Sequence, residues 1–299
     1  MQASAAVAER LASHFSDDAV RSLIIERRVE LARGLFAGME DSILNRRDLE
    51  TALGQGRISP KEFRIILGRT FVDLAMMRVV VDRQIDLPVL EQLLAQGASV
   101  VFNKLNMVFP ELGALAAGLA KRFESPVEIT AVMSFDDRSG IEPHHDTHNL
   151  FIVQLEGDKT WRLLGDPVEP GMHHDQFKGP EGEAREFVLR PGDAMFLPAG
   201  QRHICTASLG NSVHVAFLLQ HPEASMAVAV LANAILEDSR MKAPFLPFLG
   251  GEARTEALER YRARLHELVD ELDLEGILDA KGRRGTPAPF SFPERRAAK

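Results

Sequence analysis

The stretch Val127–Phe135, with the sequence VEITAVMSF, is where the chain changes from helical to strand periodicity. Apolar side chains recur at every second position of this stretch, as expected of a strand with a buried face. Turn residues rather than helices separate the later candidate strands, which favours an antiparallel sandwich or small barrel such as a jelly roll. These later strands are Thr147–Leu155, Thr160–Leu164, Glu186–Leu189, Ala194–Leu197, His203–Ala207 and Ser212–Leu219.

Helical periodicity dominates before this stretch. Residues 1–95 carry apolar residues at helical spacing, and Ser59–Glu62 resembles a capping box with proline in the first helical position. Leu87 and Pro88 begin a helix that Gly97 is expected to end. A buried strand is then expected at Ser99–Phe102, followed by a helix from Pro110 to about Phe123.

Helical periodicity returns after about residue 222, at Ala224–Glu237 and Glu252–Leu272. The second of these helices has an apolar face that is typical of packing against another helix. That face consists of Leu258, Tyr261, Leu265, Leu268 and Leu272. From Lys281 onward the chain is basic and contains prolines, which predicts a mobile tail.

Together these patterns predict a mixed α+β protein. Its core is a double-stranded β-helix, or jelly roll, with helical regions at both ends. The expected parts are a mostly helical region over 1–95 that packs on the core, a core over 96–222, and a helical region with a tail over 223–299.

Composition excludes several classes of function. The 299 residues are 45% hydrophobic, and 35 basic against 43 acidic residues give a net charge of −8, so direct binding to a nucleic acid backbone is not expected. Cys205 is the single cysteine, so no intramolecular disulfide can form. Neither a signal peptide nor an apolar run of about 18 residues is present, and we expect a cytoplasmic protein without a membrane partner.

The segment Pro143–His148, PHHDTH, contains a candidate metal site. His144 and Asp146 lie two residues apart, so both can point to one side of a strand. His203, after a Pro-x-Gly turn at the start of a late strand, can supply a third ligand from a different strand. Two imidazoles and one carboxylate form the facial triad typical of non-haem Fe(II), although Mn, Co or Ni would also fit this geometry.

Other residues offer competing interpretations. A second His-x-Asp, at His173–Asp175, lies in the glycine- and proline-containing break Gly165–Glu183, and a loop of this kind is expected to form the rim rather than hold a metal. His148 follows Asp146 by two residues and can contact the substrate, support the ligands or be structural. Cys205, two residues after His203, is expected to be a small buried residue.

Lys159 follows the turn Gly157–Asp158. We expect it on a strand that pairs with the strand carrying Phe151. A lysine at a strand start is usually solvated, but one directed into the barrel provides a point charge for a carboxylate cosubstrate.

Two blocks of sequence carry a resemblance to a known family. They are PHHDTHNLFIVQLEGDKTWR at Pro143–Arg162 and LRPGDAMFLPAG at Leu189–Gly200, the latter followed by His203. They resemble the JmjC-type 2-oxoglutarate oxygenases of the ribosomal oxygenase branch, within the cupin superfamily. The resemblance covers most of residues 127–220, and residues 94–119 fit more loosely. It departs from the family at Asn149, where an acidic residue is usual.

The resemblance implies an enzyme that uses Fe(II), 2-oxoglutarate and O2. His144, Asp146 and His203 would be the iron ligands and Lys159 the partner of the distal carboxylate of 2-oxoglutarate, with Ser212 and His214 on a strand that faces the site. The C-terminal helices would form a homodimer.

Three functions remain open at this point. The first is hydroxylation of a protein or peptide side chain, with a ribosomal protein as the expected substrate, since an acidic surface attracts a basic target. The second is oxygenation of a small molecule or natural-product peptide. The third is a cupin that binds metal without catalysis.

Overall fold

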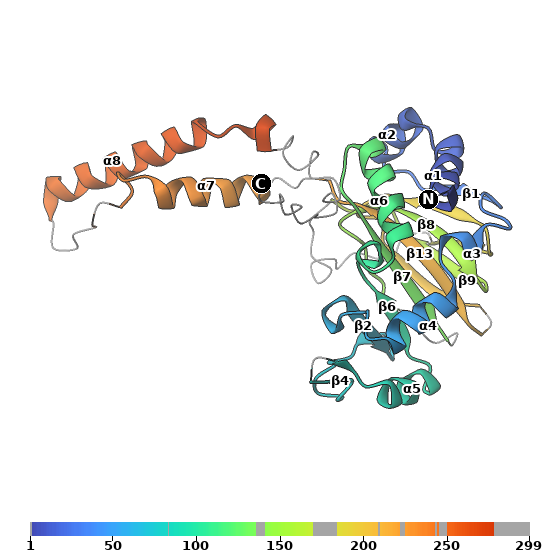
Figure 1. Cartoon of the computed structure of the whole chain (residues 1–299). Helices are drawn as coiled ribbons and strands as arrows, with labels where there is room; N and C mark the ends of the chain where they lie inside the picture. The colour runs from blue at the N-terminus through green and yellow to red at the C-terminus, as the bar shows by residue number, and fades with distance from the viewer. Residues whose placement is uncertain are drawn as a thin grey trace, which may run out of the picture. The chain divides into compact units, whose positions relative to one another are not determined.

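The computed structural model describes residues 2–82, 84–135, 141–169, 184–208, 210–221, 225–242, 244 and 250–277 (Figure 1). The chain divides into two compact units, residues 1–220 and 221–284. Within the described ranges, no helix is both long enough and apolar enough to cross a membrane.

An eight-stranded sheet forms the centre of the first unit, and all of its neighbouring strands are antiparallel. In spatial order its strands are β1 (Glu30–Ala32), β11 (Ala194–Leu197), β8 (Asn149–Glu156), β13 (Ser212–Leu219), β7 (Val127–Ser134), β6 (Ser99–Phe102), β2 (Phe63–Leu67) and β3 (Thr70–Phe71). Strands far apart in the sequence are therefore neighbours, as expected of a jelly roll.

A second sheet consists of β10 (Ala184–Leu189), β9 (Lys159–Leu164) and β12 (His203–Ala207), in that order. Side chains of both sheets share a buried apolar cluster that includes Leu150, Trp161 and Met195. The predicted jelly-roll core is therefore confirmed. A separate two-stranded sheet pairs β4 (Val80–Val81) with β5 (Gln84–Ile85).

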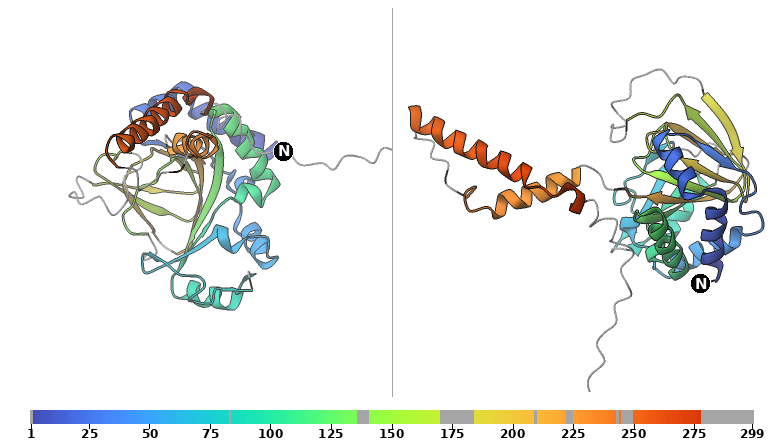
Figure 2. Two further views of the ribbon diagram at one scale, coloured as in Figure 1. Left: turned by 90° about the vertical axis from the view of Figure 1, so that its left-hand side faces the viewer. Right: turned by 90° about the horizontal axis from the view of Figure 1, so that it is seen from above.

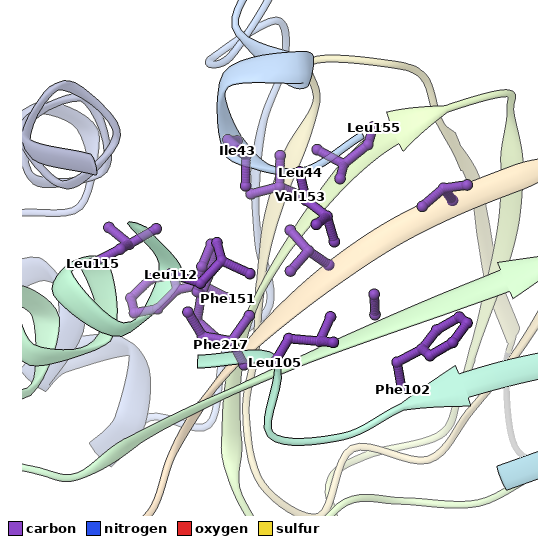
Figure 3. Packing of buried hydrophobic residues seen from close by; sticks show 14 of the residues in the cluster. Ile43, Leu44, Phe102, Leu105, Leu112, Leu115, Phe151, Val153, Leu155 and Phe217 are labelled. Atoms are coloured by element: carbon purple, nitrogen blue, oxygen red, sulfur yellow. The ribbon is translucent and has the colours of Figure 1, made fainter. Parts of the chain in front are cut away.

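Helices cover the outer face of the large sheet (Figure 2). Phe151 and Phe217 point toward Leu112 and Leu115 of α6 (Figure 3), and all four belong to the larger core cluster. The helical elements of this unit are α1 (Gln2–His14), α2 (Asp17–Ile25), α3 (Glu40–Ile43), α4 (Arg46–Gly54), η1 (Pro60–Glu62), α5 (Leu87–Ala95), η2 (Leu105–Met107) and α6 (Pro110–Phe123). The alternation of Val127–Ser134 thus has two buried sides, one against helices and one between sheets.

The N-terminal region contains the expected helices and also strands that were not expected. It supplies β1, β2 and β3 to the large sheet, and residues 1–220 form one compact unit. Phe63 and Ile65 of β2 are buried while Arg64 between them is exposed, which is the period-two pattern of a strand. Strand β2 pairs with β6, which lies more than thirty positions later in the sequence. The local sequence pattern of β2 does not indicate this partner.

Gly157 lies where the chain passes from one sheet to the other. We predicted that the strand of Lys159 pairs with the strand of Phe151, and this was wrong: β9 pairs with β10 and β12, whereas β8 pairs with β11 and β13. The Gly157–Asp158 turn therefore connects the two sheets. Gly157 has φ +63°, and a Cβ there would lie 1.9 Å from the backbone oxygen of Asn211.

Replacing Gly157 with alanine is therefore expected to lower the free energy of unfolding by about 2 to 4 kcal/mol, since a left-handed backbone and a backbone clash add. Gly56→Ala is the matched control, because Gly56 has φ +64° but no atom within 4 Å of a built Cβ. It is expected to cost only the conformational part, about 1 kcal/mol. Urea unfolding of both variants measures the difference, and equal losses would contradict the close contact.

The second unit contains α7 (Ser225–Glu237) and α8 (Gly251–Asp270). Arg264 of α8 is bonded to Asp238, Glu267 and Glu271, which ties the end of α7 to α8. Part of the predicted apolar face is buried, as at Leu268, and part is exposed, as at Leu258 (41%). The expected tail from Lys281 lies outside the described residues.

Candidate metal centre and cavity

His144, Asp146 and His203 come together between the two sheets. Their ligand atoms all lie within 4.8 Å of one another, and Nε2 of His203 is 3.8 Å from Oδ2 of Asp146. His203 begins β12 as predicted, but His144 and Asp146 lie in an irregular segment before β8 rather than in a regular strand. An isolated antiparallel bridge joins His144 to His203, with N–H···O distances of 3.1 and 2.7 Å. This bridge fixes the two imidazoles side by side.

Both histidines are oriented by backbone carbonyls. Nδ1 of His144 lies 2.9 Å from the carbonyl of Glu142, and Nδ1 of His203 lies 3.0 Å from that of Gln201. A carbonyl can only accept, so each Nδ1 donates, and Nε2 is the ring nitrogen that can bind a metal, the usual arrangement of metal-binding histidines. Burial, with the neighbouring His144, lowers the pKa of His203 to about 4. His203 is therefore neutral, and able to bind a metal, at physiological pH.

The Pro198–Gly200 turn holds the third ligand in place. The N–H of Gly200 donates to the carbonyl of Asp146 (2.9 Å), and the N–H of Ala199 donates to Oδ1 of Asn149 (3.0 Å). Asn149 thus accepts a hydrogen bond that a carboxylate at this position would also accept. The turn that leads to His203 is in this way bonded to the segment that carries Asp146.

Lys159 points into the same space and is 1% exposed. Its Nζ donates to Oγ of Ser134 (3.1 Å), which also receives a bond from Ser99 (3.1 Å). No carboxylate in the described part of the chain forms an ion pair with Lys159. Burial therefore lowers its pKa, and only the nearby Cys205 opposes this effect. A buried ammonium without a counter-charge is costly unless an anion binds beside it.

The three ligands and Lys159 line a single cavity of about 630 Å³. This volume lies within the usual range of small-molecule sites. His214 and Trp161 also line it, and neither Nδ1 of His214 nor Nε1 of Trp161 has a hydrogen-bond partner among the described residues. Burial holds the pKa of His214 well below its ordinary value, so this side chain is neutral.

The remaining candidates lie in different places. Ser212 is buried and accepts a bond from Nε2 of Gln154 (2.9 Å), but it does not line the cavity. Cys205 does line it, and burial raises the pKa of its thiol. His148 is half-buried and is absent from the lining. His173 and Asp175 lie outside the described residues.

Several lining residues were not identified from the sequence. Thr130 and Ser134 lie on the face of Val127–Ser134 opposite its regularly spaced apolar residues, and this face forms part of the cavity wall. Arg64 and Arg69 reach the cavity from β2 and the turn after it. Thr130 and Ser134 could have been found as polar residues on the face of the strand opposite its apolar positions. The arginines could not, because their proximity to the site depends on distant strand pairing.

Comparison with known proteins finds relatives of the core region. A family model described as the JmjC domain matches residues 114–227. Ribosomal oxygenase 2 of Mus musculus is 30% identical over 123 residues, which is 40% of this chain and 26% of that protein. The bifunctional lysine-specific demethylase and histidyl-hydroxylase NO66 of Drosophila mojavensis is 24% identical over 149 residues, 47% of this chain and 17% of the relative. The chain therefore spans about a quarter or less of the length of these relatives.

Solved structures agree on the fold. The X-ray structure of YcfD from Escherichia coli has a TM-score of 0.54 at 17% identity, covering 84% of this chain and 68% of that one. A second YcfD structure, described as a ribosomal oxygenase in complex with cobalt and 2-oxoglutarate, has a TM-score of 0.53 at 16% identity, covering 82% and 64%. Residues 114–227 thus match the JmjC domain, and this part of the chain is similar in sequence to ribosomal oxygenase 2.

Proposed function

We propose that this chain is an Fe(II)- and 2-oxoglutarate-dependent oxygenase that hydroxylates a protein or peptide side chain, with release of succinate and CO2. One observation carries the proposal. A three-ligand set and a buried lysine that lacks a carboxylate partner among the described residues line the same cavity. The first set suits a metal with open positions, and the second suits a dianionic cosubstrate.

His144, Asp146 and His203 would hold the iron. Two imidazoles and one carboxylate, whose ligand atoms lie within 4.8 Å of one another, match the donors that non-haem Fe(II) prefers. When bound, the iron supplies the activation of O2 that hydroxylation requires. The protein's own contribution is to keep the ligands fixed through the His144–His203 bridge.

Lys159 would bind the distal carboxylate of 2-oxoglutarate, with Ser134 beside it. Nδ1 of His214 and Nε1 of Trp161, which lack a hydrogen-bond partner within the described ranges, are polar atoms that a ligand in the cavity can reach. Ser212 supports the wall through Gln154 but does not line the cavity, so we do not propose it as a contact to the cosubstrate. These features favour a catalytic site over a cupin that only binds metal.

A protein or peptide substrate is favoured by the relatives, which are named ribosomal oxygenase and histidyl-hydroxylase. A ribosomal protein is accordingly the first substrate class to test, and the reaction would take place in the cytoplasm. The cavity volume of about 630 Å³ also suits a small molecule, which keeps that alternative open.

A homodimer through the C-terminal helices is a further part of the proposal. Exposed apolar residues on α7 and α8, such as Val228 (66%), Leu258 (41%) and Val269 (50%), supply surface for such an interface. Sedimentation analysis of the full chain would distinguish dimer from monomer.

The deciding experiment supplies anaerobically iron-loaded protein with 2-oxoglutarate, air and a mixture of ribosomal proteins. We expect succinate release that the mixture stimulates, and mass spectrometry should find one added oxygen on a ribosomal protein. Omitting iron is the control. Succinate without protein oxidation would favour a small-molecule substrate, and failure to bind either iron or 2-oxoglutarate in a titration would contradict the proposal as a whole.

A further inference from the structure

The mouth of the cavity is formed in part by β2 and β3. Arg64, Arg69 and Phe71 all line the cavity, and all three are exposed to solvent. The strand register explains why Arg64 reaches it: Arg64 pairs with Val101, Val101 with Val132, and Val132 with His214, so the four side chains share one row across the sheet.

The turn between β2 and β3 is attached to the segment that carries the metal ligands. The N–H of Glu142, two residues before His144, donates to the carbonyl of Arg69 (3.3 Å). Gly68 and Arg69 both have positive φ, +59° and +72°, as in the tight turns that join antiparallel strands. Arg69 is therefore held near the candidate metal centre by its backbone, and its side chain remains available.

The charges at this mouth differ in sign from those of the chain as a whole. Arg69 has no ion-pair or hydrogen-bond partner for its guanidinium within the described residues, and that of Arg64 is bonded only to the carbonyls of Lys61 and Phe63. The acidic residues that line the cavity are Glu142 and Asp146, and Asp146 is assigned to the metal. Among the described residues, the mouth thus carries two arginines against one acidic residue outside the metal site, Glu142, on a chain with a net charge of −8.

An arginine without a partner at a cavity mouth is suited to bind a carboxylate through two parallel hydrogen bonds. The ring of Phe71, 58% exposed, offers an apolar contact beside the arginines. A substrate with only basic residues around the acceptor would meet like charges here, which is unfavourable.

We propose that the β2–β3 hairpin selects a polypeptide segment that carries an acidic side chain next to the hydroxylated residue, with Arg64 and Arg69 as the residues that determine this specificity. The inference rests on the proposed function. It narrows the substrate from any peptide to one that is locally acidic at the acceptor site, whatever the net charge of the protein that contains it.

The test measures peptide binding without turnover. The full chain, loaded with Co(II) and 2-oxoglutarate, is used to select from a displayed library of random peptides. The unmodified protein is expected to enrich Asp and Glu, and affinity for an enriched peptide should fall about 5- to 20-fold when its acidic residue is replaced with the amide. In Arg64→Glu/Arg69→Glu the preference should reverse toward Lys and Arg.

Arg10→Glu/Arg185→Glu is the matched control, because it makes the same change in net charge at two exposed arginines that do not line the cavity. It should keep the acidic preference. Arg69→Gln alone should weaken that preference without reversing it, and this milder variant covers the case in which the double variant fails to fold. The inference is overturned if no acidic excess is enriched, if nothing is enriched, or if the excess persists in the reversed variant. Failure of the proposed function is separate, because it appears as absence of succinate from the iron-loaded protein.

Discussion

Lys159→Met is expected to raise the KM for 2-oxoglutarate about 100-fold or more while making the metal-free, ligand-free protein more stable. Removing one partner of a buried ion pair costs about 3 kcal/mol or more, and each 1.4 kcal/mol is a factor of ten. Among the described residues of the free protein, a serine hydroxyl is the only hydrogen-bond partner of the buried Lys159 ammonium. Methionine removes that desolvated charge, so the free energy of unfolding should rise by about 1 to 3 kcal/mol.

The pH dependence has a defined sign. Lys159 has a lowered pKa in the folded protein, below its ordinary value of 10.5. At pH values between the lowered pKa of the folded state and the ordinary pKa of the unfolded chain, the unfolded chain binds more protons than the folded protein. The free energy of unfolding of the free protein should therefore rise with pH across that window. Lys159→Met should abolish this slope, as measured by thermal unfolding at several pH values. Lys242→Met, at an exposed lysine of the second unit, is the control for both measurements. A variant with unchanged KM would contradict the role of Lys159.

Asp146→Ala is expected to abolish 2-oxoglutarate turnover, with a loss of about 10³-fold or more. The carboxylate is one of three candidate protein ligands, and metal contributes several kcal/mol to such reactions, where about 4 kcal/mol corresponds to 10³-fold. The side chain of Asp146 is 39% exposed, so the thermal midpoint of the metal-free protein should change little. Iron content after anaerobic loading and succinate release measure the two effects, and the added oxygen on any protein substrate should vanish with them.

Asp175→Ala decides between the two His-x-Asp motifs. If Asp146 belongs to the metal site and Asp175 to the rim, the Asp175 variant keeps its iron and its turnover. Retention of iron by Asp146→Ala, or its loss in Asp175→Ala, would reverse the assignment.

Much of the core could be predicted from local patterns. The bounds of β6, β11, β12 and β13 and of α6 agree with the expected elements, because strong alternation or a proline start coincides with clear turn residues. From these elements the jelly-roll core could be predicted. The His144, Asp146 and His203 set was chosen because a jelly roll brings early and late strands together, and the structure brings the three residues together.

Long-range pairing explains what could not be predicted. The turn Gly157–Asp158 has the composition of a hairpin turn, but it joins two sheets, and only the pairing of β9 with β12 reveals this. The three-residue strand β1 gains its structure from β11 and from bonds of Asp193 to Arg33 and Gly34. The contacts of β1 involve partners more than a hundred positions away, and they leave no periodicity in the local sequence.

The strand order of the large sheet has a consequence for work with fragments of this protein. The segment that matches the JmjC domain, residues 114–227, excludes β6, β2 and β3, which continue the sheet beyond β7. A fragment cut at those limits would keep every candidate metal ligand but would expose the unpaired edge of β7. An exposed strand edge can pair with another chain and so promotes aggregation. It would also lose Ser99, the hydrogen-bond donor to Ser134 behind Lys159. Expression limits should therefore follow the edge of the sheet, not the edge of the sequence match.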